Sequence, residues 1–73
     1  MLFRSPNPFT DIIRIELTEE SMVRIVSFDG QEVFNTMLLA GHNELSLKDF
    51  PKGIYMIIIQ EKTQVKYRKI IKI

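Results

Sequence analysis

The longest apolar run of the chain spans residues 50–60, Phe-Pro-Lys-Gly-Ile-Tyr-Met-Ile-Ile-Ile-Gln. Isoleucine is branched at Cβ and tyrosine is a flat aromatic, so both fit a pleated strand better than a helix. Pro51 lacks an amide donor and belongs just outside the hydrogen-bonded ladder, while Gly53 supplies the backbone freedom that a turn into a strand needs. We therefore predict that this run forms the central strand of a sheet.

Shorter segments in which apolar and polar residues alternate lie on both sides of this run. Alternation with a period of two predicts strands that have one face in water. These further strands are predicted at residues 12–17, 22–27, 32–38, 43–47 and 65–73. No stretch carries the 3.6-residue apolar period of a helix over three turns. Short strands joined by turns of a few residues predict an all-β fold, either a small antiparallel sandwich or a partly open barrel.

An Asp-Gly pair at positions 29 and 30 predicts a hairpin between the second and third of these strands. A two-residue loop and a three-residue loop both fit, and they differ by one residue in register. The three-residue loop holds Gly30 in the left-handed conformation and pairs Ser27 with Gln31. It puts Ile25 beside Val33, so that the apolar residues of both strands share one face. Because one residue of slip exchanges the faces, we predict the three-residue loop.

The last predicted strand is basic on one side. Its apolar phase comprises Val65, Tyr67, Ile71 and Ile73, and its basic phase comprises Lys66, Arg68 and Lys72. Lys69 and Ile70 break the alternation, which either a bulge or an edge position would explain. We interpret the cations as the wet face of an edge strand, since lysines at an edge discourage unwanted strand pairing. The alternative is a basic stripe for a polyanion or a partner protein.

Composition narrows the class of protein. The chain has 73 residues, of which 45% are hydrophobic and 26% charged, and its net charge is +1. This length predicts one domain that buries roughly 60% of its unfolded surface, too little for a deep catalytic cleft. A near-neutral charge argues against disorder and against nucleic acid as a partner. No segment reaches the ~20 apolar residues of a membrane helix, so we expect no stable membrane insertion.

No residue pattern points to catalysis or to a cofactor. The chain has no cysteine, which excludes disulfides and thiolate metal sites. His42 is the only histidine, and a single imidazole without acidic ligand spacing is more typical of a turn than of a metal site. No serine has a histidine at a motif spacing, and the three glycines form no phosphate-binding cluster. We predict no catalytic, cofactor-binding or metal-binding residues, and therefore no enzyme.

Several short motifs follow one another in a definite order. They are Pro6-Asn7-Pro8-Phe9, then Val23-Arg24-Ile25 leading to Phe28-Asp29-Gly30 with Val33 beyond, then Gly41 with Asn43, Leu45 and Leu47, then Pro51-Lys52-Gly53-Ile54-Tyr55, and finally Lys69-Ile70-Ile71. In this order and spacing the chain resembles the C-terminal sorting domain of type IX secretion substrates, the Por secretion system type A domain. The resemblance marks Pro6, Asn7, Pro8, Gly30, Gly53, Tyr55 and Lys69 as sorting-motif residues. One departure is Ser5, which stands where an aromatic residue often precedes Pro-Asn-Pro.

The resemblance implies a seven-stranded immunoglobulin-like sandwich at the end of a larger exported protein of Bacteroidota-type bacteria. It implies residues 1–5 as a linker remnant or added residues, and residues 6–73 as the sorting domain. The implied partners are an upstream passenger domain, the type IX translocon and a sortase-like peptidase that removes the domain. The passenger would pass through the periplasm to the outer membrane, the cell surface or the medium. An immunoglobulin-like binding or adhesion module of an extracellular protein is the alternative.

The central run is apolar on both sides, which exceeds the needs of a two-layer fold. One phase comprises Tyr55, Ile57 and Ile59, and the other, which we call the docking patch, comprises Ile54, Met56 and Ile58. A sandwich buries one face of each sheet, so the second apolar face needs another cover. We expect the passenger domain, a second copy in a weak homodimer or the translocon to cover the docking patch.

Overall fold

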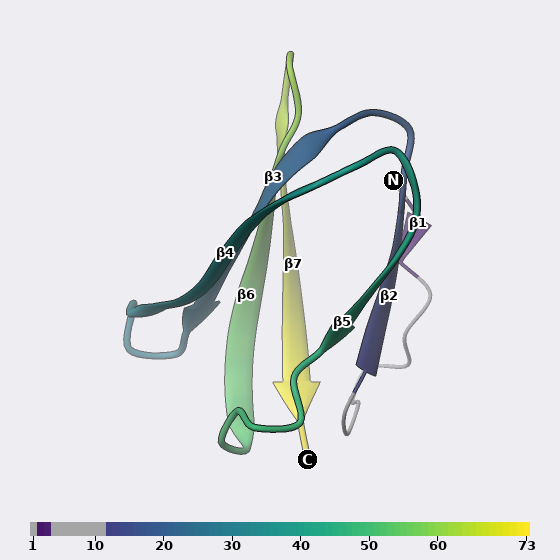
Figure 1. The fold of residues 1–73 in the computed structure, drawn as a ribbon. Coiled ribbons are helices and arrows are strands. Elements are labelled where there is room, and N and C mark those ends of the chain that lie inside the picture. The colour runs from purple at the N-terminus through teal and green to yellow at the C-terminus, as the bar shows by residue number, and fades with distance from the viewer. Residues whose placement is uncertain (1, 4–11) are drawn as a thin grey trace.

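Seven antiparallel strands form the part of the chain that the structure, a computed structural model, describes, namely residues 2–3 and 12–73 (Figure 1). The strands are β1 (Leu2–Phe3), β2 (Ile12–Leu17), β3 (Ser21–Ser27), β4 (Glu32–Leu38), β5 (Gly41–Ser46), β6 (Gly53–Gln60) and β7 (Val65–Lys72). They build a three-stranded sheet in the order β1-β2-β5 and a four-stranded sheet in the order β4-β3-β6-β7. The all-β prediction is confirmed, and the two separate sheets make the fold a sandwich.

The chain crosses between the two sheets in three of its connections. The links from β2 to β3 and from β4 to β5 cross at one end of the sandwich, and the link from β5 to β6 crosses at the other (Figure 1). The β3–β4 and β6–β7 connections are hairpins within the four-stranded sheet. Such alternation of hairpins and crossings is the Greek-key connectivity of immunoglobulin-like sandwiches. The edge strands are β4 and β7 in one sheet and β1 and β5 in the other.

The core lies between the facing sides of the two sheets. Its buried apolar residues are Ile13, Ile15, Leu17, Val23, Ile25, Leu45, Leu47, Tyr55, Ile57, Ile59 and Ile70. β6 is hydrogen-bonded to β3 on one side and to β7 on the other, so the prediction of a central strand is confirmed. Its ladder begins at Gly53, after the proline that lacks an amide donor. Alternation along β2, β3 and β6 places every second side chain in the core because successive side chains point to opposite faces.

The β3–β4 hairpin has the predicted loop but not the predicted apolar pair. The Ser27 amide donates to the Gln31 oxygen at 2.8 Å, and Gly30 has a φ of 88°, so the three-residue loop with left-handed Gly30 is confirmed. Ile25 lies beside Phe34 and not beside Val33, because a bulge makes Val33 an extra residue on β4. Val33 is 40% exposed, while the larger Phe34 packs against the core.

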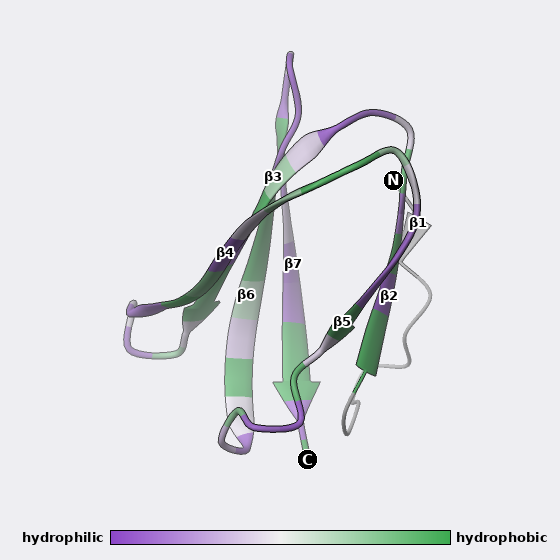
Figure 2. Cartoon of the chain, in the orientation of Figure 1, coloured by the Kyte–Doolittle hydropathy of each residue, from purple (hydrophilic) through white to green (hydrophobic). Residues whose placement is uncertain are grey.

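The last strand buries a different set of residues from the predicted one. Ile70 is fully buried and Lys72 is 6% exposed, whereas Tyr67 is 66% exposed. The β6–β7 register runs without a bulge and pairs Ile70 with Tyr55, so Ile70 must share the inward face of Tyr55. The edge position therefore explains the broken alternation, and the prediction that Lys72 lies on a wet face is wrong. Figure 2 shows β7 hydrophilic along its middle and hydrophobic toward its end.

β5 begins earlier than the sequence predicts. Gly41 and His42, expected in a turn, are the first two residues of the strand and pair with Leu17 and Glu16 of β2. Leu47, expected as the last strand residue, follows the strand but is buried in the core. The corner that leads from β5 into β6 therefore starts at a residue anchored by apolar contact.

Candidate functional site

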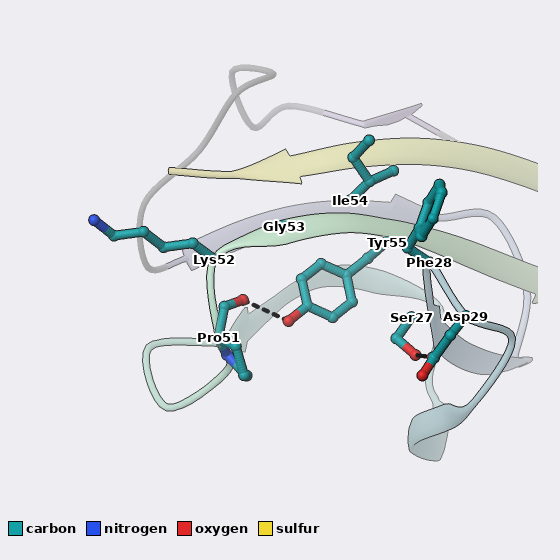
Figure 3. Close-up of a pocket in the computed structure, with 8 residues that line it drawn as sticks. All are labelled: Ser27, Phe28, Asp29, Pro51, Lys52, Gly53, Ile54 and Tyr55. Atoms are coloured by element: carbon teal, nitrogen blue, oxygen red, sulfur yellow. Dashed lines mark hydrogen bonds between the residues drawn. The ribbon is translucent and has the colours of Figure 1, made fainter.

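Residues 47–52 form the corner between β5 and β6. The hydroxyl of Tyr55 donates to the main-chain oxygen of Pro51 at 2.5 Å (Figure 3). The ring of Tyr55 lies 5.8 Å from that of Phe50, centroid to centroid, and the Phe50 amide donates to the Leu47 oxygen at 3.0 Å. A tyrosine near the start of this strand that bonds back to the preceding corner is the tyrosine corner of immunoglobulin-like domains. Tyr55 thus sets the path by which the chain enters β6.

Lys72 ties the last strand to the same corner. Its ammonium donates to the main-chain oxygen of Leu47 and, at 2.7 Å, to that of Phe50. A buried ammonium has three donors and is costly unless they are satisfied, so the two carbonyls replace water that the side chain has lost. The alternation of Lys72 with Ile70 was the only sequence signal for this contact, because the two carbonyls lie 25 and 22 residues earlier in the chain.

The turn after β3 is held by a short polar network. The Ser27 hydroxyl donates to Asp29 Oδ1, and the Gln31 amide approaches the same oxygen at 3.4 Å. The hydrogen bond from Ser27, followed by that from Gln31, holds the pKa of the Asp29 carboxyl below its usual value. Gly30 completes this turn with its left-handed backbone. Phe28 lies between Ser27 and Asp29 in this turn, and its side chain is 83% exposed.

A shallow hollow, which we call the Phe28 hollow, lies where this turn meets β6 and β7. Its lining residues are Ser27, Phe28, Ile54, Tyr55, Met56 and Lys69. An adjoining depression shares Phe28 and Ile54 and extends past Asp29 to Pro51, Lys52 and Gly53 (Figure 3). The surface around Phe28 therefore combines exposed apolar side chains with cations at its rim.

The structure brings together five of the seven described sorting-motif and docking-patch residues. Those that line the two depressions are Gly53, Ile54, Tyr55, Met56 and Lys69. Gly30 lies in the turn two residues after Phe28, and Ile58 lies farther along β6, opposite Tyr67. Pro6, Asn7 and Pro8 fall outside the described residues. Phe28 was not predicted to be part of this surface, although the sequence places this aromatic residue directly before the Asp-Gly turn.

The outer face of β6 is apolar and open to solvent. Ile54 and Met56 are 40% and 37% exposed, and Ile58 is half-buried. Met56 lies between Val26 of β3 and Lys69 of β7 in the sheet. Neighbouring exposed apolar side chains make this face a candidate surface for binding another macromolecule.

The polar side chains of the described strands include a cross-strand pair at the surface. His42 Nε2 lies 3.3 Å from Glu16 Oε1 on the surface of the three-stranded sheet, as a cross-strand pair. Within residues 2–3 and 12–73 no group of three or more His, Cys, Asp and Glu side chains could hold a metal ion. Among the same residues, no helix has the length and apolar character that crossing a membrane requires. The Phe28 hollow is lined mainly by apolar and aromatic side chains, which makes it a candidate surface for binding a partner.

One known family matches almost the whole chain. A family model described as "Secretion system C-terminal sorting domain" matches residues 5–73. The match includes every strand from β2 to β7 and all the ordered motifs from Pro6 onward. Among curated proteins, none matches this chain.

Proposed function

The chain belongs to the secretion system C-terminal sorting domain family, and we propose that the docking patch and the Phe28 hollow form the surface that the type IX translocon reads. Membership gives the chain a role as a secretion and sorting signal, and it makes the domain non-catalytic. A passenger domain and the type IX machinery are its partners, and the passenger is secreted across the outer membrane.

The main support for a translocon-binding surface is the apolar outer face of the central strand. The inner residues of β6 already fill the core, so Ile54 and Met56 add nothing to it and remain exposed. Binding a partner would remove this apolar surface from water, which favours association. Lys69 beside Met56 adds a positive charge at the rim. A translocon component with an apolar surface and a nearby carboxylate would complement both features.

The sorting-motif residues divide into two roles in this proposal. Gly30, Gly53 and Tyr55 build the surface, because they shape the turn that holds Phe28 and the corner that leads into β6. Lys69 contacts the partner directly. The two groups predict different defects: substitution of Gly30, Gly53 or Tyr55 would alter folding, whereas substitution of Lys69 would alter recognition.

We propose that the passenger is processed after export in the way that the family resemblance implies. Residues 1–5 belong to the linker and residues 6–73 to the sorting domain, and the linker adds the short strand β1 to the three-stranded sheet. A sortase-like peptidase would cut ahead of the six strands from β2 to β7. The passenger would then be released to the medium or attached to surface lipopolysaccharide. Pro6, Asn7 and Pro8 would mark the start of the domain, since two prolines in three residues favour a stiff, extended entry.

Secretion of a reporter tests the translocon-binding surface. The chain is fused to the C-terminus of a reporter that is exported to the periplasm of a type IX-competent host. Met56→Glu places a carboxylate on the docking patch, and the matched control Val65→Glu makes the same kind of change at a 43% exposed position at the far end of β6 and β7. We expect the reporter outside the cells to fall at least about tenfold for Met56→Glu and to stay within about twofold for Val65→Glu.

Two outcomes would contradict the proposal, and they differ in what they overturn. Full export of the Met56→Glu fusion, with an unchanged melting temperature of the isolated variant chain, would refute the translocon-binding surface but not the sorting role. Export that persists after removal of residues 65–73 would oppose the sorting role itself. That second result would favour an immunoglobulin-like adhesion module.

A further inference from the structure

β4 is an edge strand whose regular part carries no charge. It pairs with β3 on one side, and no other described strand pairs with it (Figure 1). Residues 33–41 contain no Asp, Glu, Lys, Arg or His. The outer edge of such a strand presents main-chain N–H and C=O groups that can pair with a further strand, and proteins usually protect it with charged residues.

Of the other edge strands, the two long ones, β5 and β7, are protected in that way. β7 carries Lys66, Arg68 and Lys69, so two copies of this strand would bring like charges together. β5 carries Glu44, which is paired with Arg14 of β2 at 2.8 Å. Only β4 among these three strands lacks charged side chains beyond its first residue.

The inward side chains of β4 leave the core partly open at this edge. Phe34 and Leu38 pack against the core but are only half-buried, and Thr36 between them is half-buried too. On the other face Met37 is 50% exposed. The bulge at Val33 ends the regular ladder, so residues 34–38 are the part of the edge that remains straight enough to pair.

We propose that two copies of this chain pair through β4, antiparallel and centred on Thr36. In this register Phe34 of each copy meets Leu38 of the other, Asn35 meets Met37, and Thr36 meets Thr36. Phe34 and Leu38 of the two copies then cover one another at the open edge of the core, and the central threonines form a favourable cross-strand pair. The uncharged stretch meets its own copy without repulsion, which is the argument for a second copy over a charged partner.

The pairing joins two four-stranded sheets into one sheet of eight strands. A two-fold axis perpendicular to this sheet keeps the outer faces of both copies on the same side. The two docking patches are then presented together, and a partner with two binding sites would gain avidity. The dimer itself does not depend on the role of the docking patch. A contact of five residues per copy makes it weak, so it forms at high concentration.

Sedimentation equilibrium of the whole chain, from about 10 µM to about 1 mM, measures the dimer. Met37→Lys adds a cation within the paired stretch, and we expect it to weaken dimerisation at least about tenfold. Met56→Lys is the matched control on the outer face of the same sheet, and we expect no change. A chain that stays monomeric throughout, or a dimer abolished by Met56→Lys and not by Met37→Lys, would overturn the proposal.

A single cysteine tests the register. The chain has no cysteine of its own, so Thr36→Cys introduces the only thiol. Opposed residues of antiparallel strands have Cβ atoms about 4.5–5.5 Å apart, close enough for a disulfide after small adjustments. We expect Thr36→Cys to form a cross-linked dimer under mild oxidation at least about tenfold faster than Thr63→Cys in the exposed β6–β7 turn. Equal rates for the two variants would rule out pairing centred on Thr36.

Discussion

The ammonium of Lys72 donates a hydrogen bond of 2.7 Å to the main-chain oxygen of Phe50, and so joins the last strand to the corner that precedes the central strand. A second bond from the same nitrogen reaches Leu47, and the hydroxyl of Tyr55 bonds Pro51 in the same corner. One corner therefore receives side-chain donors from two strands. The start of β6, which carries Ile54 and Met56, depends on it for its position.

Replacing Lys72 tests how much this contact contributes to the stability of the domain. Lys72→Met keeps an unbranched side chain of similar reach but leaves both carbonyls without their donor, and we expect a loss of about 1–3 kcal/mol in the free energy of unfolding. Urea denaturation measures the loss. The exposed Lys62→Met is the control and should change stability by less than about 0.5 kcal/mol. Equal stability of the two variants would show that the buried ammonium contributes nothing.

Tyr55 has a matched control in the only other tyrosine of the chain. Tyr55→Phe removes the hydroxyl that binds Pro51, and we expect a destabilisation of about 0.5–1.5 kcal/mol. Tyr67 is 66% exposed, so Tyr67→Phe should leave the melting temperature unchanged. If both variants have the same melting temperature as the unmodified chain, the tyrosine corner does not stabilise this domain.

Substitution of Gly30 is expected to destabilise the chain because of its backbone conformation alone, without a side-chain clash. Its φ of 88° strains any residue with a Cβ, yet a Cβ built there would have no atom within 4 Å. We expect Gly30→Ala to cost about 1–2 kcal/mol in unfolding free energy, and Gly30→Asn to cost less because asparagine tolerates the left-handed region. Thermal unfolding compares the two. An alanine variant as stable as the asparagine variant would exclude backbone strain as the cause.

Asp29 predicts a specific dependence of stability on pH. Its pKa in the folded chain lies below the usual value of 3.8, because the Ser27 hydroxyl and the Gln31 amide bond the charged form. The carboxylate therefore contributes stability above pH 3.8, and this contribution is lost as the pH falls through the lower folded pKa. Unfolding free energies of the chain and of Ser27→Ala should differ at pH 6 and converge toward pH 2, roughly the range in which such a carboxyl titrates. A difference that stays constant over this range would contradict the linkage.

The sequence located the candidate site only in part. Alternation along residues 54–59 was enough to assign Ile54 and Met56 to one face, because the side-chain period of a strand is independent of its neighbours. It did not predict that Lys69 would lie beside Met56 or that Phe28 would join them. Those neighbours come from different strands, and the register between strands decides which side chains meet.

The sequence by itself determined the strands from β2 to β7 apart from the start of β5, the central position of the apolar run, the left-handed Gly30 turn and the order of motifs that identifies the family. Each of these depends on local torsion preferences or on spacing along the chain. Tertiary structure decided that Phe34 packs inward in place of Val33, and that Ile70 and Lys72 face the core. Which phase of an edge strand is buried depends on the opposite sheet and on carbonyls more than 20 residues away, and no local pattern records their position.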